Sequence, residues 1–449
     1  MKQNRTNRLV ATILAAGVCA GAARAQSSDA LLNKLVSKGV LTAQEAEELK
    51  KEQDAASDKA YRSKTGLPDW VNQLKLYGDV RGRFDKIYFE NNQNGLPTTD
   101  RNRYRYRLRA GVTATMKDDF ELGFRLTSGD GVGAFGGNTL SGNSTMQDNG
   151  SKKGIYVDLA YGKWSPLHHG PWTGGITIGK MENPFANSDM VWDPDYTPEG
   201  GAIQVGYKIN DQHSLKVSGA AFILDELNQG AGASRDPVLW GAQARWDGKW
   251  TKQLNSSLGF AYYTISDKEN LGNAAVENLN FGNTRNAAGN LVYNYNPIVV
   301  DAAVTYLLPA SPVYPGEFPV KLWGEYINNP SAPNRDDGYT GGVTFGKAGK
   351  KRAWEVGYRY ERLEGDAWYE EFVNDDFGAF AQAAQANSGL GNGYRSGTNM
   401  KGHIIKASYS LSDAFTLSIT YYLTELIHKL PAGSESGTGR VFVDAMWKF

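Results

Sequence analysis

The chain has 449 residues and equal numbers of basic and acidic side chains, 48 of each, so its charge balance argues against a nucleic-acid binder. Its mean hydropathy of −0.48 would suit a water-soluble protein, and no stretch after Ala25 has the length and apolarity of a membrane-spanning helix. However, 12% of the residues are aromatic and 52 are glycine. A membrane β-barrel has this composition, because lipid-facing and water-facing residues alternate along its strands.

Residues 1–25 predict a secretory signal peptide. Lys2, Arg5 and Arg8 precede an uncharged stretch, and residues 23–25 have the small-x-small pattern of a cleavage site. We expect cleavage before Gln26. An uncleaved anchor helix is the alternative, but the apolar run is shorter than the roughly 20 residues that span a bilayer.

The predicted mature chain differs from the full chain in two respects. The signal contains four of the 48 basic residues and none of the 48 acidic ones, so the predicted mature chain has four fewer basic than acidic residues. The only cysteine, Cys19, lies within the signal and follows Val18, where a lipidation site requires Gly or Ala. We therefore expect a mature chain without disulfide or lipid anchor.

Residues 26–64 predict a periplasmic helical hairpin or short coiled coil. Leucines and Val36 form an apolar stripe over residues 31–36, and Thr42 with Glu45 makes a capping box for a second helix. Two interpretations stay open: the segment mediates oligomerisation or a tether to the cell wall, or it packs near the mouth of the following domain.

From residue 70 to residue 449 the hydrophobic period changes to two, which indicates β-strands. Between Phe415 and Thr424, apolar residues alternate with mostly Thr and Ser. Such segments have the length of tilted membrane-crossing strands. The sequence therefore predicts an all-β transmembrane fold, an antiparallel outer-membrane β-barrel of about 16 strands. The segments begin near residues 73, 102, 118, 152, 174, 201, 213, 237, 253, 296, 319, 338, 351, 400, 414 and 439.

The connections between these strands alternate in length. Tight turns are expected at 116–119, 210–212, 247–249, 347–350 and 411–413. Long loops are expected around 90–101, 130–150, 183–200, 267–294 and 365–398. Outer-membrane barrels have short periplasmic turns and long outer loops, whereas a soluble sandwich or propeller lacks this asymmetry. The loop 366–400 is then expected to be exposed, with binding of a host surface or phage as a secondary role.

The last strand keeps one apolar face, Val441, Val443, Ala445 and Trp447, up to the terminal Phe449. A terminal Phe on such a strand resembles the signal that barrel-assembly machinery recognises. The alternative is that an edge strand ends in Phe by chance.

Three stretches, residues 31–42, 45–49 and 70–83, resemble a Gram-negative family of putative porins, which is distantly similar to phosphate-selective porins. The resemblance implies a periplasmic helical segment before a 16-stranded barrel, passive diffusion of small polar solutes, and a homotrimer. The expected surroundings are outer-membrane lipid and lipopolysaccharide.

A basic ladder marks the expected interior of the barrel. Arginine occupies every second position from 101 to 109, so all five side chains lie on one face of a strand. They must line the lumen, because one Arg at the bilayer midplane costs about 2–4 kcal/mol. Two arginines on the preceding strand share this face with Asp79 and Asp85. The predicted pore-lining residues are Arg81, Arg83, Arg101, Arg103, Arg105, Arg107 and Arg109.

The third long loop, Glu182 to Gly200, is the candidate constriction. Its carboxylates would face the arginines and set up a transverse field in the pore. It lacks a Pro-Glu-Phe-Gly-Gly type motif, so the prediction depends on loop order and charge. The alternative is an outward loop whose carboxylates are solvated or bind divalent cations loosely. The predicted constriction residues are Glu182, Asp189, Asp193, Asp195 and Glu199.

The predicted function is a passive channel with a modest anion preference. Acidic strand residues such as Asp158, Glu325 and Glu355 argue against that preference. The alternative is an adhesin or structural anchor with a plugged lumen. An enzyme is not expected, since none of the five histidines has a serine motif nearby. No P-loop, dinucleotide fingerprint or metal-ligand spacing occurs, so no cofactor or metal is predicted.

Overall fold

The computed structural model describes residues 66–89, 100–130, 140–227, 235–271, 282–287, 289–378, 397–428 and 436–449. The chain divides into two compact units, residues 1–72 and 73–449. The predicted signal peptide and helical segment lie outside the described residues, so both stay predictions. Within the described ranges no helix is long and apolar enough to cross a membrane.

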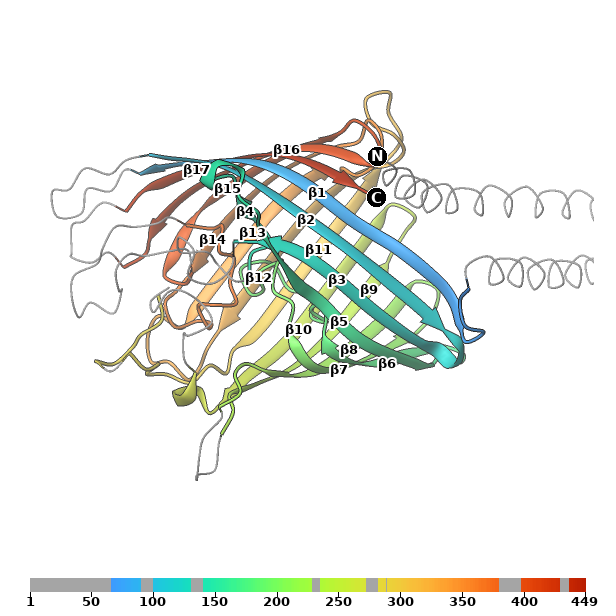
Figure 1. Ribbon diagram of the computed structural model, residues 1–449, viewed down its shortest axis with the longest axis horizontal. Coiled ribbons are helices and arrows are strands. Elements are labelled where there is room, and N and C mark those ends of the chain that lie inside the picture. Colours follow the sequence, from blue (N-terminus) through green and yellow to red (C-terminus); the bar gives the residue numbers. More distant parts are fainter. Residues whose placement is uncertain are drawn as a thin grey trace, which may run out of the picture. The chain divides into compact units, whose positions relative to one another are not determined.

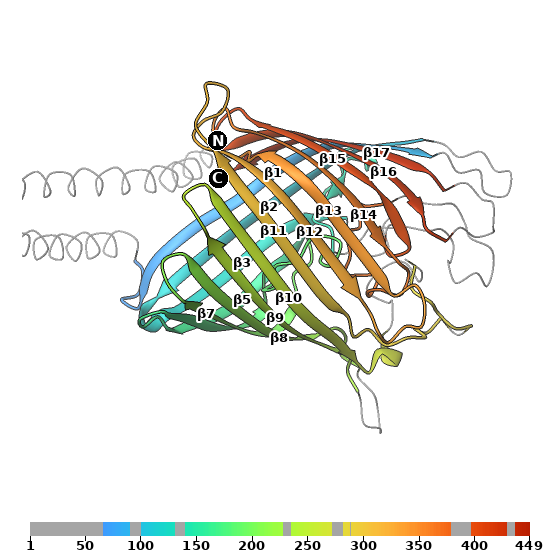
Figure 2. The same ribbon diagram turned by 180° about the vertical axis from the view of Figure 1, so that it is seen from behind.

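The second unit is a closed antiparallel β-barrel. Its sixteen long strands each pair with the next one along the chain, and β17 pairs with β1 to close the sheet. Figure 1 shows the red strands β16 and β17 beside the blue β1, and Figure 2 shows β10 to β14 from behind, tilted in a common direction. The predicted 16-stranded barrel is confirmed, and each predicted strand start lies within three residues of an observed one.

The strands are β1 (Val71–Phe89), β2 (Arg101–Met116), β3 (Phe120–Gly129), β4 (Ser144–Thr145), β5 (Gly154–Leu167), β6 (Trp172–Lys180), β7 (Glu199–Lys208), β8 (His213–Ile223), β9 (Val238–Lys249), β10 (Leu254–Ser266), β11 (Ile298–Leu308), β12 (Phe318–Asn328), β13 (Asp337–Gly346), β14 (Trp354–Leu363), β15 (Met400–Ser410), β16 (Phe415–Leu426) and β17 (Thr438–Lys448). Short 3-10 helices are η2 (Lys117–Asp119), η3 (Asp148–Gly150) and η4 (Lys268–Asn270). The two-residue β4, which the sequence analysis did not predict, pairs with β2 inside the long β3–β5 connection.

The two faces of each strand differ as the alternation predicts. On β16, Leu417, Ile419 and Leu423 are between 42% and 48% exposed on the outer surface, whereas Thr420 and Thr424 are buried on the inner one. Apolar residues thus form the lipid-facing surface and polar residues face the interior, which is the arrangement of a membrane barrel rather than a soluble one.

One expected turn is placed differently. Residues 247–249 belong to β9, and the turn follows at 250–253. Strand β9 is longer because Asp247 and Lys249 continue its pairing with β10, opposite Ser257 and Asn255. Here the hydrogen bonds of the sheet override the turn preference of these residues.

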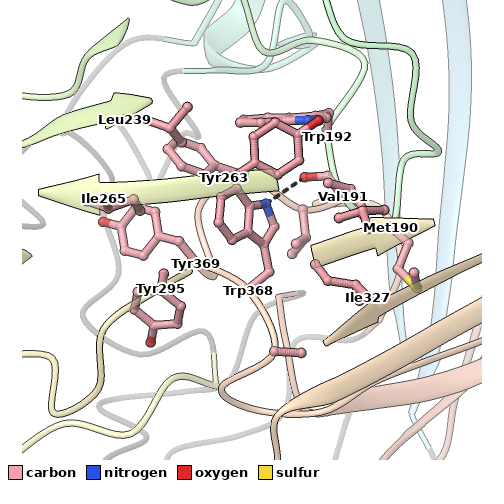
Figure 3. Close-up of a cluster of buried hydrophobic side chains, with 14 of the residues drawn as sticks. Met190, Val191, Trp192, Leu239, Tyr263, Ile265, Tyr295, Ile327, Trp368 and Tyr369 are labelled. Atoms are coloured by element: carbon pink, nitrogen blue, oxygen red, sulfur yellow. Dashed lines mark hydrogen bonds between the residues drawn. The ribbon is translucent and has the colours of Figure 1, made fainter. Parts of the chain in front are cut away.

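Two connections fold inward instead of extending outward. These are the β6–β7 loop, residues 181–198, and the described part of the β14–β15 loop, residues 364–378. Trp192 and Trp368 pack together with Tyr263 of β10 and Ile327 of β12 (Figure 3), which form part of one cluster of buried apolar side chains. The expectation of an exposed loop from residue 366 was therefore wrong for residues 366–378, since Trp368 is 0% exposed.

Candidate pore constriction

Arginine side chains cover one stretch of the inner surface, on the three adjacent strands β17, β1 and β2. We call this set the arginine wall. Its outward-facing neighbours on β2, Tyr104 and Leu108, are exposed on the lipid side. The wall comprises Arg81 and Arg83 of β1, Arg101, Arg103, Arg105, Arg107 and Arg109 of β2, and Arg440 of β17.

Most of these arginines are paired with carboxylates of the same wall. Asp79 accepts hydrogen bonds from Arg107 at 3.0 Å and from Arg109 at 2.8 Å. Asp85 pairs with Arg103 and, at 3.1 Å, with Arg440. The ladder is thus a network of alternating charges. Its electrostatic effect on a solute is much smaller than the number of arginines suggests.

Two arginines differ from the rest. Among the described residues, Arg81 and Arg105 form no ion pair, and the Nε atom of each is buried without a hydrogen-bond partner. Arg81 Nη2 donates to Asn143 Oδ1 at 2.6 Å, so this side chain is held by a neutral amide. The positive charge of the wall is therefore least compensated at these two positions.

The β6–β7 loop crosses the lumen and is fixed at several points. Glu182 accepts a hydrogen bond from Arg125 of β3. Ser188 contacts Glu325 of β12, with 3.0 Å between Ser188 N and Glu325 Oε2. Asp189 binds the guanidinium of Arg359 on β14 through both of its oxygens. Inward-facing polar residues of several strands therefore hold the loop inside the barrel.

The five acidic residues predicted for the constriction have four different surroundings. Asp195 reaches the arginine wall, where it accepts a hydrogen bond from Arg107 at 3.2 Å. Glu182 and Asp189 pair with arginines elsewhere on the barrel. Glu199 begins β7 and pairs with Lys180 at 2.9 Å, and its side chain is 65% exposed, so the structure places it away from the arginine wall.

Asp193 has a different role, joining the two inward loops. Its carboxylate accepts the backbone N–H of Asp195 at 2.6 Å and that of Asp375 at 3.1 Å. Burial, together with the nearby carboxylates of Asp375 and Asp195, raises the pKa of Asp193 well above its ordinary value. This side chain therefore organises the loops rather than pairing with an arginine.

The β14–β15 loop completes the constriction, and the sequence analysis missed it. Trp368 Nε1 donates to the carbonyl of Val191 at 2.9 Å, a contact shown by the dashed line in Figure 3. The backbone N–H of Asp193 donates to Phe372 O at 2.6 Å. Four aromatic residues between positions 368 and 377 were the signal for burial, because an exposed loop rarely carries so many.

A cavity of about 440 Å³ lies beside the loops on the β12–β17 side of the lumen. Charged and aromatic side chains together line it, which suits solutes that carry both polar and apolar groups. The lining includes Arg81, Arg83, Arg359, Lys406, Trp323 and Phe442. Within the described ranges, no group of three or more His, Cys, Asp or Glu side chains is arranged to hold a metal ion.

A lipid-facing barrel with a charged lumen narrowed by inward loops defines a membrane channel protein. The sequence family described as putative porin matches residues 55–288, somewhat more than half of the chain. The chain belongs to this porin family, and its fold and family indicate an outer-membrane channel rather than an enzyme.

One solved porin structure supports this fold, and others are more distantly similar. The high-pH structure of Pseudomonas putida OprB aligns with a TM-score of 0.51 and 13% identity, covering 84% of this chain and 94% of that one. Two mutants of Rhodopseudomonas blastica porin cover 84% of this chain and 100% of their own, each with a TM-score of 0.40 and with 11% and 12% identity. No curated protein sequence matches this chain.

Proposed function

We propose that this porin forms a water-filled channel for passive diffusion of small polar or charged solutes, with a modest preference for anions. The observation that carries the proposal is the constriction, where the carboxylates of two inward loops face the arginine wall. Opposite charges on two sides of a narrow lumen orient dipolar solutes and disfavour apolar ones. The anion preference is modest because most arginines of the wall are paired with carboxylates, while Arg81 and Arg105 form no ion pair among the described residues and keep a buried Nε atom without a partner.

The proposal includes the path to the membrane and the assembly. The signal peptide, residues 1–25, is removed on export, and residues 26–64 stay in the periplasm. The barrel-assembly machinery reads the terminal Phe449, and the barrel comes to lie in outer-membrane lipid and lipopolysaccharide. We further propose a homotrimer, on the family resemblance; native mass spectrometry of detergent-solubilised protein tests it, and a monomeric mass would contradict it.

Reversal potentials in planar bilayers under a KCl gradient test the anion preference. The variants R81Q and R105Q remove the two least compensated charges without breaking an ion pair, so each should move the reversal potential towards cation selectivity. R235Q is the control for a charge lost from a loop, because the Arg235 side chain is 72% exposed and its ion pair with Asp267 is long, at 3.8 Å. A wild-type channel that prefers K⁺ to Cl⁻, or equal shifts in all three variants, would contradict this part of the proposal.

A second candidate function, a structural anchor with a plugged lumen, is favoured by one observation. The two inward loops form an apolar core inside the barrel, in which Trp192 and Trp368 are buried. Discrete conductance steps distinguish the two functions, because an anchor with a closed lumen gives none. The 440 Å³ cavity and its charged lining favour the channel.

A further inference from the structure

Besides Asp195, a second loop carboxylate pairs with the arginine wall, and it contacts two arginines at once. Asp376 lies in the β14–β15 loop, and its Oδ2 atom is 3.1 Å from Arg83 Nη1. Its Oδ1 atom is 3.3 Å from Arg440 Nη2, and Arg440 Nη1 also donates to the backbone carbonyl of Asp376 at 3.1 Å. The other acidic partners of these two arginines, Asp444 and Asp85, belong to β17 and β1.

The guanidinium groups around Asp376 are held in place by the wall itself. The ring of Phe442 lies under both, 3.8 Å from Arg83 Cζ and 4.5 Å from Arg440 Cζ. Cation–π stacking and the hydrogen bonds to Asp444 and Asp85 fix both side chains, which are 7% and 3% exposed. The site therefore does not need Asp376 in order to exist, and its donors are arranged in advance for a carboxylate.

The charge of a third guanidinium, that of Arg105, also acts on Asp376, and within the described part of the chain Arg105 has no ion pair of its own. Arg105 is 8% exposed, its Nε atom has no hydrogen-bond partner among the described residues, and it forms no ion pair there. Burial alone would raise the pKa of Asp376, but the charges of Arg440, Arg83 and Arg105 outweigh it and hold the pKa below its ordinary value. The site thus holds more positive charge than one loop carboxylate neutralises.

Arg83 connects this site to the solute space of the lumen. Arg83 and Phe442 also line the 440 Å³ cavity, together with Arg81. Arg83 therefore both contacts Asp376 and borders the solute space. A carboxylate entering the cavity therefore meets Arg83, one of the two donors that Asp376 occupies.

We propose that Arg83, Arg105 and Arg440 form a binding site for the carboxylate of a small organic acid, and that Asp376 is a tethered competitor which the solute displaces. This inference depends on the proposed channel function and deepens it by naming a solute class. Because a tethered group is present at millimolar effective concentration or higher, free organic acids bind the wild-type site weakly and leave it readily. Weak binding is what conduction requires, since a tightly held solute blocks the pore.

The test is block of the KCl current through full-length protein in planar bilayers. Gluconate and glucose are the probes, because they share a six-carbon chain and differ in the carboxylate. In D376N the half-blocking concentration of gluconate should fall about tenfold, since the competitor is gone while the guanidinium groups remain. The half-blocking concentration of glucose should not change. D211N is the matched control, because the Asp211 side chain is 94% exposed in a turn, and it should behave as wild type for both probes.

Equal gluconate block in wild type and D376N, or an equal change for glucose, would overturn the inference. Folding of each variant is checked by circular dichroism, and D376S replaces D376N if the latter does not refold. Calorimetric titration of the detergent-solubilised variants with gluconate tests the binding site separately from the channel function. Tighter gluconate binding by D376N without any conductance would contradict the channel function but support the binding site. Conductance without a change in gluconate affinity would contradict only the binding site.

Discussion

Arg107 of β2 is shared between the wall and the loop: it donates to Asp79 of β1 at 3.0 Å and to Asp195 of the β6–β7 loop at 3.2 Å. The wall contact holds the guanidinium in place whether or not the loop is docked. At its other end the same loop is fixed by Asp189, which binds Arg359 of β14. The β6–β7 loop is therefore held by ion pairs at both sides of the lumen.

The two members of this pair should affect selectivity in opposite directions. D195N removes a carboxylate while Arg107 keeps Asp79, so the reversal potential should shift towards anions. R107Q leaves Asp195 without its partner, so the reversal potential should shift towards cations. Measurement in a KCl gradient compares both variants with wild type. Shifts of the same sign would mean that the loop lies away from the ion path.

Replacing Trp368 should weaken the packing of the two inward loops against each other. Its ring is 0% exposed, and its Nε1 atom donates to Val191 O at 2.9 Å. A buried Trp→Ala change costs about 3–5 kcal/mol of stability. Here the loss lowers the stability of the docked loops and leaves the strand pairing unaffected. W368A should therefore raise the conductance and the current noise while the far-ultraviolet circular dichroism of the barrel stays unchanged.

The control for this prediction is W250A, which removes the same kind of side chain from the turn between β9 and β10. Trp250 is 52% exposed and lies outside the apolar core of the two loops. Its replacement should leave the conductance as in wild type. Equal conductance in W368A and wild type would show that the loops stay docked without this contact.

The barrel was predictable because its signal is local. The apolar and polar alternation of β16 depends on each residue's own position along the strand, and its predicted start, residue 414, is one residue from the observed Phe415. The same period predicted that the arginine side chains of β2 face the lumen. Neither inference requires knowledge of which residues meet in space.

The constriction was only partly predictable, because its contacts join distant parts of the chain. Trp368 and Val191 are 177 residues apart, and no local pattern links them. Arg440 was not predicted as a pore-lining residue, because a single arginine in β17 forms no repeating pattern like that of β2. The pairing of Asp79 with Arg107 and Arg109 depends on how β1 and β2 lie side by side, which the alternation does not fix.

The docked loops should be sensitive to pH through Glu371. Burial and the neighbouring carboxylate of Glu370 raise the pKa of Glu371 to about 8, with a further contribution from Asp225 and opposing ones from Tyr369 and Arg285. Its Oε1 atom has no hydrogen-bond partner among the described residues. The group therefore stays protonated in the docked loop at pH values where a released loop would be ionised.

The sign of the effect follows from this difference. Docking is most stable below about pH 4.5, where Glu371 is protonated in both states, and loses stability as the pH rises towards 8. Conductance should rise between pH 6 and pH 9 as the loop releases, and E371Q should remove most of this dependence. An identical pH profile in E371Q would assign the titration to another group.

The terminal Phe449 closes the barrel against Gly78 of β1. The backbone N–H of each residue donates to the carbonyl of the other at 3.1 Å. A Cβ atom at position 78 would lie 2.4 Å from Cζ of the Phe449 ring and 2.3 Å from the carbonyl oxygen of Arg109. Only glycine leaves room for this approach, because no real Cβ contact is so short.

G78A should therefore disturb the same closure that F449A removes, and both variants should reduce the yield of folded barrel in the outer membrane severalfold. The yield is measured as the fraction whose migration in a detergent gel changes on heating. G82A is the matched control on the same strand and face, since a Cβ at Gly82 would meet no atom within 4 Å. If G78A assembles as well as G82A while F449A fails, Phe449 acts through recognition by the assembly machinery rather than through its contact with β1.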